Sequence, residues 1–437
     1  MRFVIFVFFV ICLLVPGSAV AQGPASLQSD QLTASFLKTV TPGTFHPTRN
    51  ADGGGGVLGR QSSGGTLGVD SVANWTSYFY ESAQGAPYAI APGYFQFAFP
   101  YTMVGHAPFG QGNEQDWNGE KTWINAPVVP VSLDLRNADG SPRYVNGHRL
   151  YYDATQYVAP VLASPVFSKV QYDSSEEPTQ FTDALMRAEF FHRSDAEWHT
   201  ILRPRAVTPR TMVLIRGTYR FALNSDGSCC LYVLVDSGTF GNALFPTIPI
   251  DTTTPVGAAE NAGEVRTKDI ATFLFPNTYL YFNGDPTQCC VLGYHTYDLE
   301  PGDPTNGFQE RRYVLNYSSW ITNGLFNGFA DITALSHELS ETFNDPFGGN
   351  ATPWWLSPNG NCQNNLETGD VIEGLPNAIY PIQLNGATWS PQNEALLQWF
   401  AGIQNSDAIH HAYSYPDITV LTVPAVPQNV GCTPPIL

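Results

Sequence analysis

The chain has 437 residues, and its 38 Asp or Glu against 20 Lys or Arg give a formal net charge of −18 at pH 7. A hydrophobic share of 43% is enough for a packed core and excludes a wholly disordered chain. The acidic balance argues against nucleic acid as a partner, because phosphate binding needs a cationic face.

Residues 1–21 have the layout of a secretory signal peptide. Arg2 precedes the apolar run 3–15, and the small-residue triplet 19–21 (AVA) supplies an A-x-A cleavage site. The run is too short to span a bilayer, so a retained anchor is the weaker alternative. We therefore expect a secreted protein, extracellular or in the cell envelope, whose mature chain has no membrane span.

Two segments of unusual composition follow. Residues 22–72 are expected to form a flexible, Gly-rich lead-in, and whether it serves as a propeptide is left open. Its glycine run at 53–59 contains G-x-G-x-x-G, but no apolar strand precedes it, so a dinucleotide site is not expected. The aromatic-rich segment 73–123 is expected either to be buried β-structure or to bind sugar or peptide.

Residues 124–423 are predicted to form one α+β domain, and 424–437 a C-terminal tail. The run 127–135 (PVVPVSLDL) predicts a strand, and apolar residues at helical spacing predict a helix over about 178–191. Further β-rich runs joined by turns are 211–223 with 229–235, and 279–282 with 289–297. This order of elements predicts an α+β fold.

The cysteines indicate disulfide bonds. Six remain after the predicted signal peptide: Cys229, Cys230, Cys289, Cys290, Cys362 and Cys432. An even number in an exported chain favours disulfides, although six cysteines allow 15 pairings. Because neighbouring strand residues point to opposite faces, one cysteine of each doublet is expected to bridge two strands. A thiolate metal site is disfavoured because the C-x-x-C spacing is missing.

The segment 331–346 (DITALSHELSETFNDP) carries the clearest chemical signal. Asp331 is expected to cap a helix at its N-terminus, and Pro346 to end it. An apolar stripe is formed by Ile332, Leu335, Leu339 and Phe343. At about 100° per residue, His337 and Glu341 lie one turn apart and nearly opposite that stripe. We therefore expect one face to pack on the core and the other to face a cleft.

The pattern is H-E-x-x-H with the second His replaced by Glu. An imidazole and a carboxylate on one rigid turn are ligands that zinc accepts, and Glu338 beside them can act as a general base. The third ligand is expected downstream, with Glu367 the first choice and Asp370 the second, since the glycine between them permits a tight turn. The sequence thus predicts one zinc ion per chain in a zincin-like metalloprotease. The alternative is an ordinary amphipathic helix with a solvated polar face.

Four other residues are weaker candidates. Asp345 lies at the helix end and is expected to be a cap or turn residue. His410 and His411 are expected at the surface, and they are the next source of a ligand if Glu367 and Asp370 both fail. His295 is expected either near the cleft or buried on a strand.

These motifs resemble the secreted phosphate-induced-protein/EXORDIUM-like family. The likeness rests on 337–342 (HELSET), 344–346 (NDP), 354–355 (WW) and 367–370 (ETGD), and 289–295 is similar to the strand before that helix. It covers about 280–405 and implies a zincin-like fold in an extracellular or cell-wall setting. At Val371-Ile372 family members often have a Cys, so the partner of Cys362 is left open.

Two functions follow as expectations. The first is a secreted zinc metallohydrolase that acts on a peptide or protein substrate. The second is a non-catalytic extracellular or cell-wall binding protein on the same scaffold, because the family is better known for wall-associated growth roles than for proteolysis. In this alternative the aromatic side chains contact cell-wall glycan or a partner.

Overall fold

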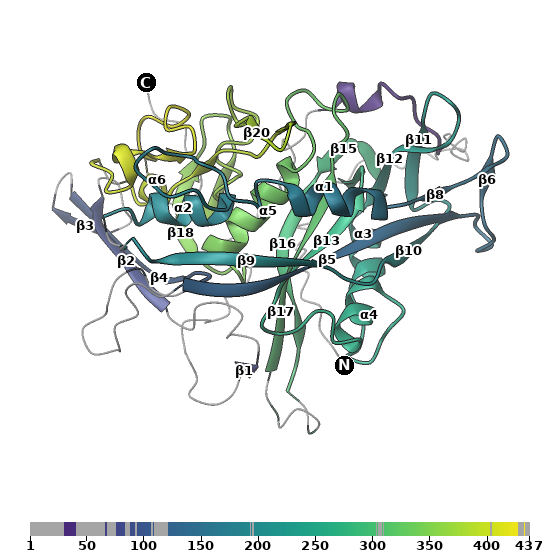
Figure 1. Cartoon of the computed structure of the whole chain (residues 1–437), viewed down its shortest axis with the longest axis horizontal. Coiled ribbons are helices and arrows are strands. Elements are labelled where there is room, and N and C mark those ends of the chain that lie inside the picture. Colours follow the sequence, from purple (N-terminus) through teal and green to yellow (C-terminus); the bar gives the residue numbers. More distant parts are fainter. Residues whose placement is uncertain are drawn as a thin grey trace, which may run out of the picture.

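The computed structural model describes most of the chain from residue 30 onward. The described residues are 30–40, 66–67, 76–83, 88–91, 94–105, 108, 121–192, 194, 196–302, 304, 308, 310–402, 404–426 and 432. Residues 1–21, where the sequence predicts a signal peptide, and the glycine run at 53–59 lie outside them. Within the described residues the protein is a mixed α+β structure, as the sequence predicts (Figure 1).

The largest sheet has eight strands. Its order is β1-β17-β13-β5-β10, with β16 beside β17 and with β8 and β9 beside β5. The strands are β1 (Thr66–Leu67), β5 (Lys121–Arg136), β8 (Tyr151–Tyr152), β9 (His199–Ala206), β10 (Arg210–Ile215), β13 (Ile270–Pro276), β16 (Gly293–Glu300) and β17 (Glu310–Trp320). β5 pairs in parallel with β9, β10 and β13, whereas β16 pairs antiparallel to β17.

A second sheet has the order β11-β12-β14-β15. Its strands are β11 (Tyr219–Leu223), β12 (Cys229–Asp236), β14 (Thr278–Phe282) and β15 (Asp285–Val291). Two predicted strands are therefore split between the sheets. The run 211–223 turns at Gly217, whose φ of 105° is left-handed backbone, and the run 289–297 breaks at Leu292 between β15 and β16.

The helices are short. They are α1 (Val158–Ala163), α2 (Phe181–Glu189), α3 (Ser237–Leu244), α4 (Pro255–Asn261), α5 (Thr333–Asn344), α6 (Leu397–Phe400) and the 3-10 turns η1 (Phe36–Thr39), η3 (Thr155–Tyr157) and η5 (Ile409–His411). α2 corresponds to the helix predicted over 178–191, and α5 to the helix predicted within 331–346. α5 contacts β16, β17 and α2.

The start of α5 differs from the prediction. The N-cap position is Ile332, and no side chain caps it. Asp331 has a left-handed φ of 41°, and its carboxylate accepts hydrogen bonds from the N–H groups of Ile332 and Ser390. Asp331 therefore joins the helix start to the segment near residue 390 instead of capping the helix.

Several small sheets complete the described chain. They are β2 (Thr76–Ala83), β4 (Tyr94–Thr102) and β3 (Tyr88–Ala91), then the pairs β6 (Tyr144–Val145) with β7 (His148–Arg149), β18 (Ala351–Leu356) with β19 (Cys362–Asn365), β20 (Ile382–Leu384) with β21 (Ala387–Trp389), and β22 (Glu394–Ala395) with β23 (Ser414–Tyr415). The segment 73–123 thus contributes a three-stranded sheet. Trp123, at the end of this segment, is 50% exposed, and the guanidinium group of Arg203 lies over its ring. The aromatic side chains of residues 73–101 lie outside what the structure describes, and so does the choice between burial and binding for them.

The central strands separate two hydrophobic clusters, because neighbouring residues of a strand point to opposite faces. Val128 and Val314 pack in the cluster that contains the apolar stripe of α5. Val129 and Leu315, one residue further along, pack in the cluster that contains side chains of α3 and α4. Packing in the first cluster holds α5 against β16 and β17, and the candidate site lies between these elements.

Part of the expected lead-in is packed against the domain. Asp30 forms ion pairs with Arg143 at 2.5 Å and Arg216 at 2.9 Å, and Leu37 is 1% exposed. These contacts correct the expectation of a flexible segment over 22–72 for residues 30–40. The strand β5 also begins at Lys121, so it crosses the boundary predicted between 123 and 124.

The disulfides differ from the predicted cross-strand bridges. Cys229 bonds to Cys230, and Cys289 bonds to Cys290, so each doublet closes on itself. Because both sulfur atoms of a doublet are used in this bond, neither reaches a neighbouring strand. The partner of Cys362, which the sequence left open, is Cys432.

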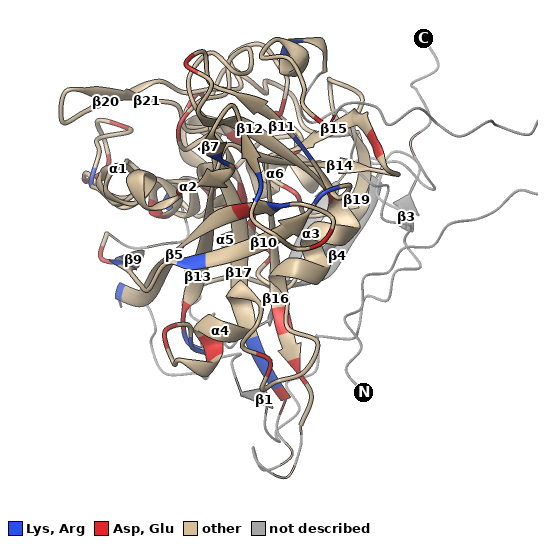
Figure 2. Ribbon diagram, turned by 90° about the vertical axis from the view of Figure 1, so that its right-hand side faces the viewer, with Lys and Arg blue, Asp and Glu red and all other residues tan. Residues whose placement is uncertain are grey.

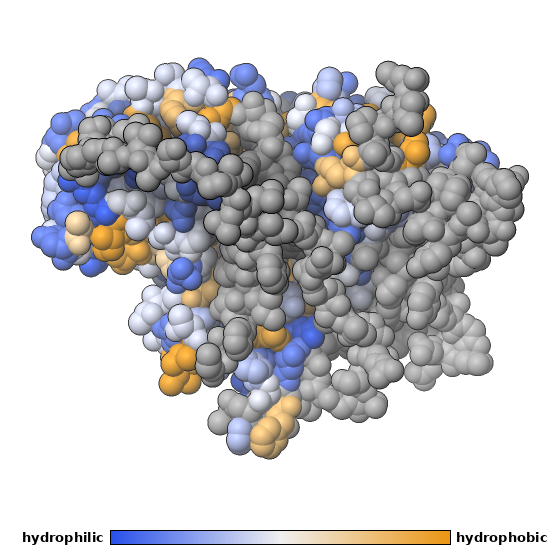
Figure 3. Space-filling model, turned by 180° about the vertical axis from the view of Figure 1, so that it is seen from behind, coloured by the Kyte–Doolittle hydropathy of each residue, from blue (hydrophilic) through white to orange (hydrophobic). Residues whose placement is uncertain are grey.

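Polar and apolar residues are mixed over the described surface. Seen from behind, hydrophobic residues form several separate patches among hydrophilic ones (Figure 3). Lys and Arg positions are spread over several elements in the view of Figure 2. Within the described part of the chain, no helix combines the length and the apolar character needed to cross a membrane.

Candidate metal centre

The centre forms where β16, α5 and the segment 367–370 meet. All twelve residues of α5 are buried, including the polar ones. The sequence predicted that the polar face of the helix lines an open cleft. The structure shows instead that this face is buried. It is covered by the segment 367–370 and by residues 392–394, which hydrogen-bond to the helix and to that segment.

His337 lies in one group of possible ligands. Its Nε2 atom is 3.3 Å from Glu341 Oε1 and 3.5 Å from Asp370 Oδ1. The ligand atoms of the three side chains lie within 4.8 Å of one another, and all three residues are buried. One imidazole nitrogen and two carboxylate oxygens form a donor set that a divalent metal ion accepts.

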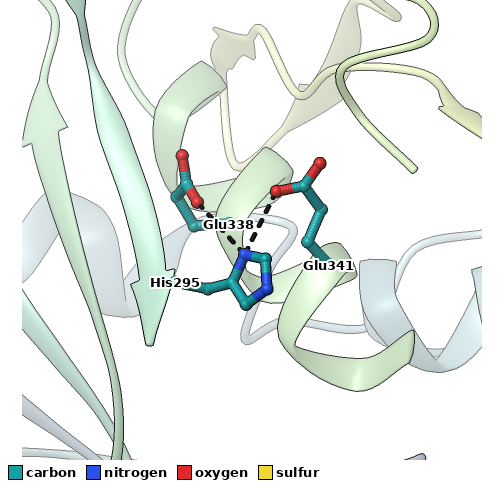
Figure 4. A group of neighbouring side chains, drawn as sticks. All are labelled: His295, Glu338 and Glu341. Carbon is teal, nitrogen blue, oxygen red and sulfur yellow. Dashed lines mark ion pairs between the residues drawn. The ribbon is translucent and has the colours of Figure 1, made fainter. Parts of the chain in front are cut away.

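His295 lies in a second group, on β16 (Figure 4). Its Nδ1 atom is 3.2 Å from Glu341 Oε2 and 3.8 Å from Glu338 Oε2. The ligand atoms of His295, Glu338 and Glu341 also lie within 4.8 Å of one another, and all three residues are buried. Glu367 Oε2 lies 3.7 Å from the same nitrogen. Glu341 thus belongs to both groups, because its Oε1 faces His337 and its Oε2 faces His295.

Burial and the attraction between the histidines and the carboxylates together shift the pKa values in the centre. Burial disfavours a charged imidazole, but the neighbouring carboxylates outweigh it and hold the pKa values of His295 and His337 well above their usual range. Burial would raise the pKa of Glu341, yet the two histidines hold it well below its usual range. For Glu338 burial prevails and raises the pKa to about 7.

Two glycines allow the backbone to come close to these side chains. A Cβ atom on Gly369 would lie 2.5 Å from His337 Nδ1, and one on Gly293 would lie 2.6 Å from Glu338 Cγ. Gly369 has no left-handed φ, so it is required for close approach rather than for the tight turn predicted from the sequence. Its N–H also donates to Glu341 Oε1 at 3.0 Å.

Hydrogen bonds from side-chain amides outside the two groups orient the carboxylates of Glu367 and Asp370. The side-chain amide of Asn365 donates to Glu367, and that of Gln363 donates to Asp370. Gln392 Nε2 donates to the carbonyl oxygen of Gly369 at 2.8 Å. Such outer partners orient ligands and are part of a metal site's affinity.

The structure therefore brings together His337, Glu338, Glu341, Glu367 and Asp370, the predicted site residues. Asp345 is a turn residue, because its carboxylate accepts from the N–H groups of Gly349 and Asn350. His410 and His411 lie elsewhere: His410 pairs with Asp173 at 2.7 Å, and His411 Nδ1 contacts the carbonyl oxygen of Ser406.

His295 is the residue that the sequence left undecided. It lies 38 positions before the start of α5 in the chain, and it reaches the helix because β16 pairs with β17 and packs against α5. The available signal was a histidine next to a tyrosine on an apolar strand. That pattern is common for a buried histidine that binds nothing, so the sequence alone does not identify it.

No family model, curated protein or solved structure matches this chain. The likeness to the EXORDIUM-like family therefore stays an expectation from its motifs. What the described residues show is a mixed α+β fold with two His/carboxylate groups, either of which could hold a metal ion.

Proposed function

We propose that the protein is a secreted, zinc-dependent metallohydrolase with a zincin-like active-site helix, acting on a peptide or protein substrate. The observation that carries the proposal is the group formed by His337, Glu341 and Asp370, with Glu338 next to it. The donor chemistry fits zinc, which accepts imidazole nitrogen and carboxylate oxygen in catalytic sites. The motif resemblance agrees with this assignment.

Glu338 has the properties of a general base. It follows a candidate ligand directly in α5, and burial raises its pKa to about 7, which suits proton transfer at neutral pH. When bound, zinc would polarise a carbonyl group and acidify a water molecule. Glu338 would accept the proton of that water and pass it to the leaving amine. Because two ligands are carboxylates, the centre is less cationic than a His-rich one, and activity should be slower or shifted to higher pH.

A second function is supported by the burial of the centre. His337 is 8% exposed and Glu338 5%, and structural zinc sites are closed whereas catalytic sites keep an open position. The same chain could therefore hold a structural ion and act as a non-catalytic extracellular or cell-wall binding protein. Cell-wall glycan would then be a candidate partner.

The two functions differ in what a chelator does. The purified mature chain is incubated with an unfolded protein substrate, with and without chelator, and its zinc content is measured in parallel. For a hydrolase, we expect cleavage that chelator abolishes and that added zinc restores. A zinc-containing chain that cleaves no peptide bond would leave the binding protein as the function.

Two variants separate binding from chemistry. His337→Ala is expected to lose the zinc of the first group, because it removes one of about three protein ligands. Glu338→Gln is expected to keep that ion and lose hydrolysis, because an amide cannot accept the proton. His410→Ala is the control, since His410 also pairs with a carboxylate but lies outside the centre. Unchanged cleavage by the Glu338→Gln variant would remove Glu338 from the base role.

The distances support Asp370, the second choice from the sequence, over Glu367 as the third ligand. Asp370 Oδ1 is the carboxylate oxygen near His337, whereas Glu367 Oε2 lies near His295. We now expect Asp370→Ala to weaken the ion at His337 more than Glu367→Ala does. Measured zinc affinities of the two variants decide this, and the opposite order would restore Glu367 as the third ligand.

A further inference from the structure

We propose that the group around His295 is a second divalent-cation site and that Glu341 bridges the two ions. The first group provides His337, Glu341 and Asp370, as above. The second provides His295, Glu338 and Glu341. A carboxylate that presents one oxygen to each of two sites is the usual bridge of two-metal centres, whose ions lie about 3.5–4 Å apart.

The geometry of Glu341 favours a carboxylate that bridges two ions, and not a single ion shared by both histidines. Its Oε1 is 3.3 Å from His337 Nε2, and its Oε2 is 3.2 Å from His295 Nδ1. The two histidines therefore approach different oxygens of the same carboxylate. Each histidine also has its own further carboxylate, Asp370 at 3.5 Å and Glu338 at 3.8 Å. The donors are thus divided into two sets that have only Glu341 in common.

The charge of the cluster agrees with two ions. Four buried carboxylates belong to the two groups and their surroundings: Glu338, Glu341, Glu367 and Asp370. A fifth buried acid, Glu394, lies near them, but burial raises its pKa well above its usual range and favours its neutral form. Among the described contacts, the ion pairs of Glu338 and Glu341 are all with the two histidines and none is with Lys or Arg. An imidazole that ligates a metal ion is neutral, so with both histidines bound the four ionised carboxylates carry −4, and one divalent ion leaves −2 whereas two leave zero. Without metal, the two histidines balance part of this charge as imidazolium. Uncompensated charge is costly in a buried site, which favours the second ion.

His295 makes no polar contact outside the cluster. It is 6% exposed, and its Nε2 atom has no hydrogen-bond partner within the described residues. All of its polar contacts run through Nδ1 to Glu338, Glu341 and Glu367. A histidine held for packing alone needs no such set of carboxylates around one nitrogen. The arrangement fits a cation bound at Nδ1.

The second site would also change the role of Glu338. This step rests on the proposed function, in which Glu338 is the base. Once Glu338 ligates a cation at His295, its lone pair is no longer free to accept a proton from water. Zinc in excess of one equivalent is therefore expected to inhibit hydrolysis, and Glu338 acts as base only in the form with one ion.

Metal content is the direct test. The purified mature chain is stripped with chelator and dialysed against a series of free Zn²⁺ concentrations, and bound zinc is measured by elemental analysis. We expect two ions per chain for the wild type at saturation. His295→Gln and His337→Gln should each hold one ion, and Glu341→Gln should weaken both.

The controls use histidines outside the centre. His199→Gln removes a buried histidine that pairs with Asp183 at 2.7 Å, and His410→Gln removes an exposed one. Both should still bind two ions, and circular dichroism checks that every variant is folded. Should His295→Gln fail to fold, Glu338→Gln takes its place and should weaken only the second ion.

Two results would overturn the second site. One is a wild-type chain that holds a single ion at saturation, and the other is a His295→Gln variant that still holds two. Neither result touches the proposed hydrolase, which needs only the ion at His337. Conversely, a chain that binds two ions at saturation but shows no hydrolysis even with one equivalent of zinc would support the second site and remove the proposed function.

Discussion

Gly369 shows how a single missing side chain shapes the centre. Its backbone passes so close to His337 that a Cβ atom would lie 2.5 Å from Nδ1, a separation that non-bonded atoms do not reach. The same residue donates its N–H to Glu341. A larger residue would therefore displace the imidazole of His337 or the backbone that donates to Glu341.

Gly369→Ala is accordingly predicted to weaken zinc binding at His337 by about tenfold or more, since displaced outer contacts of metal ligands have effects of that size. Gly238→Ala is the matched control, because its Cβ would sit 3.4 Å from Asp236 Oδ1, an ordinary contact, with no left-handed φ. Competition with a chromophoric chelator measures both affinities. Equal affinities in the two variants would show that the close approach is not needed.

Glu189 is a buried acid outside the centre. It is 1% exposed, and its Oε2 atom has no hydrogen-bond partner within the described residues. Burial raises its pKa well above the usual range, although the N–H of Leu397 and the side chain of Asn344 oppose this. The folded state therefore binds a proton that the unfolded state releases at lower pH.

This gives a pH dependence of stability with a definite sign. As pH rises from the ordinary pKa of a glutamate toward the raised pKa in the folded state, the unfolded chain binds fewer protons, so Glu189 makes the free energy of unfolding fall. Glu189→Gln removes the charge but keeps the shape. We predict that the variant gains stability relative to wild type on going from pH 4 to neutral pH. Urea unfolding at several pH values measures this, and parallel curves for both proteins would contradict it.

At the scale of elements, α5 connects the hydrophobic core to the centre. Leu335, Leu339 and Phe343 pack on the cluster that includes strands β5, β13 and β17. The helix has a polar face that carries ligands and no side-chain cap at its start. The packing of the apolar stripe therefore contributes to holding the helix in place, together with the hydrogen bonds of Asp331 at its start.

Leu339→Ala is predicted to lower the free energy of unfolding by about 2–5 kcal/mol, because the residue is completely buried and its removal leaves a cavity. Val213→Ala, at a position 41% exposed, should change it by less than about 1 kcal/mol. Chemical denaturation of the chelator-treated chains gives both values. A similar small loss in both variants would mean that the helix is not anchored by its stripe.

The sequence predicted α5 well because a helix is encoded locally. Its apolar residues recur at helical spacing, and the same spacing places His337 and Glu341 one turn apart. What covers the polar face is not local: the segment 367–370 reaches it through long-range hydrogen bonds such as that from Gly369 to Glu341. The sequence therefore predicts the candidate ligands on the helix, but it does not predict the closure of the site or the place of His295.

Pairing partners that the sequence does not reveal, distant or adjacent, explain the errors outside the centre. Asp331 was expected to cap α5, but the N–H of Ser390, 59 positions away, shares its carboxylate. The cysteine doublets were expected to bridge strands, but each pair of sulfur atoms bonds internally. Residues 30–40 have no strong periodicity, yet Asp30 finds its partner at Arg143. A single sequence does not specify such partners.

At the scale of the whole molecule, that N-terminal ion pair ties the first described segment to the domain. Arg143 donates to both carboxylate oxygens of Asp30, and the two side chains are about one-tenth exposed. Burial alone would raise the pKa of Asp30, but Arg143 and Arg216 lower it below its usual range. The pair therefore adds stability above the ordinary pKa of an aspartate, and that stability is lost as pH falls through the lowered pKa.

Asp30→Asn is predicted to lower the free energy of unfolding at neutral pH by about 3–5 kcal/mol, because it leaves Arg143 without its buried counter-charge. Arg216→Ala should cost no more than about 1 kcal/mol, since Arg216 is half exposed. Unfolding curves at pH 7 and at low pH measure the effect, and the difference between Asp30→Asn and wild type should shrink in acid. A difference that stays constant with pH would show that the ion pair is not its source.

The disulfides within the two cysteine doublets affect what disulfide mapping by mass spectrometry detects. Within each doublet the oxidised pair belongs to one short stretch of chain, so a digest without reduction yields an ordinary linear fragment that is lighter by two hydrogens. Only Cys362 and Cys432 join two distant peptides. A search for cross-linked fragments would therefore recover one bridge, and an alkylation assay for free thiols would find none among these six cysteines.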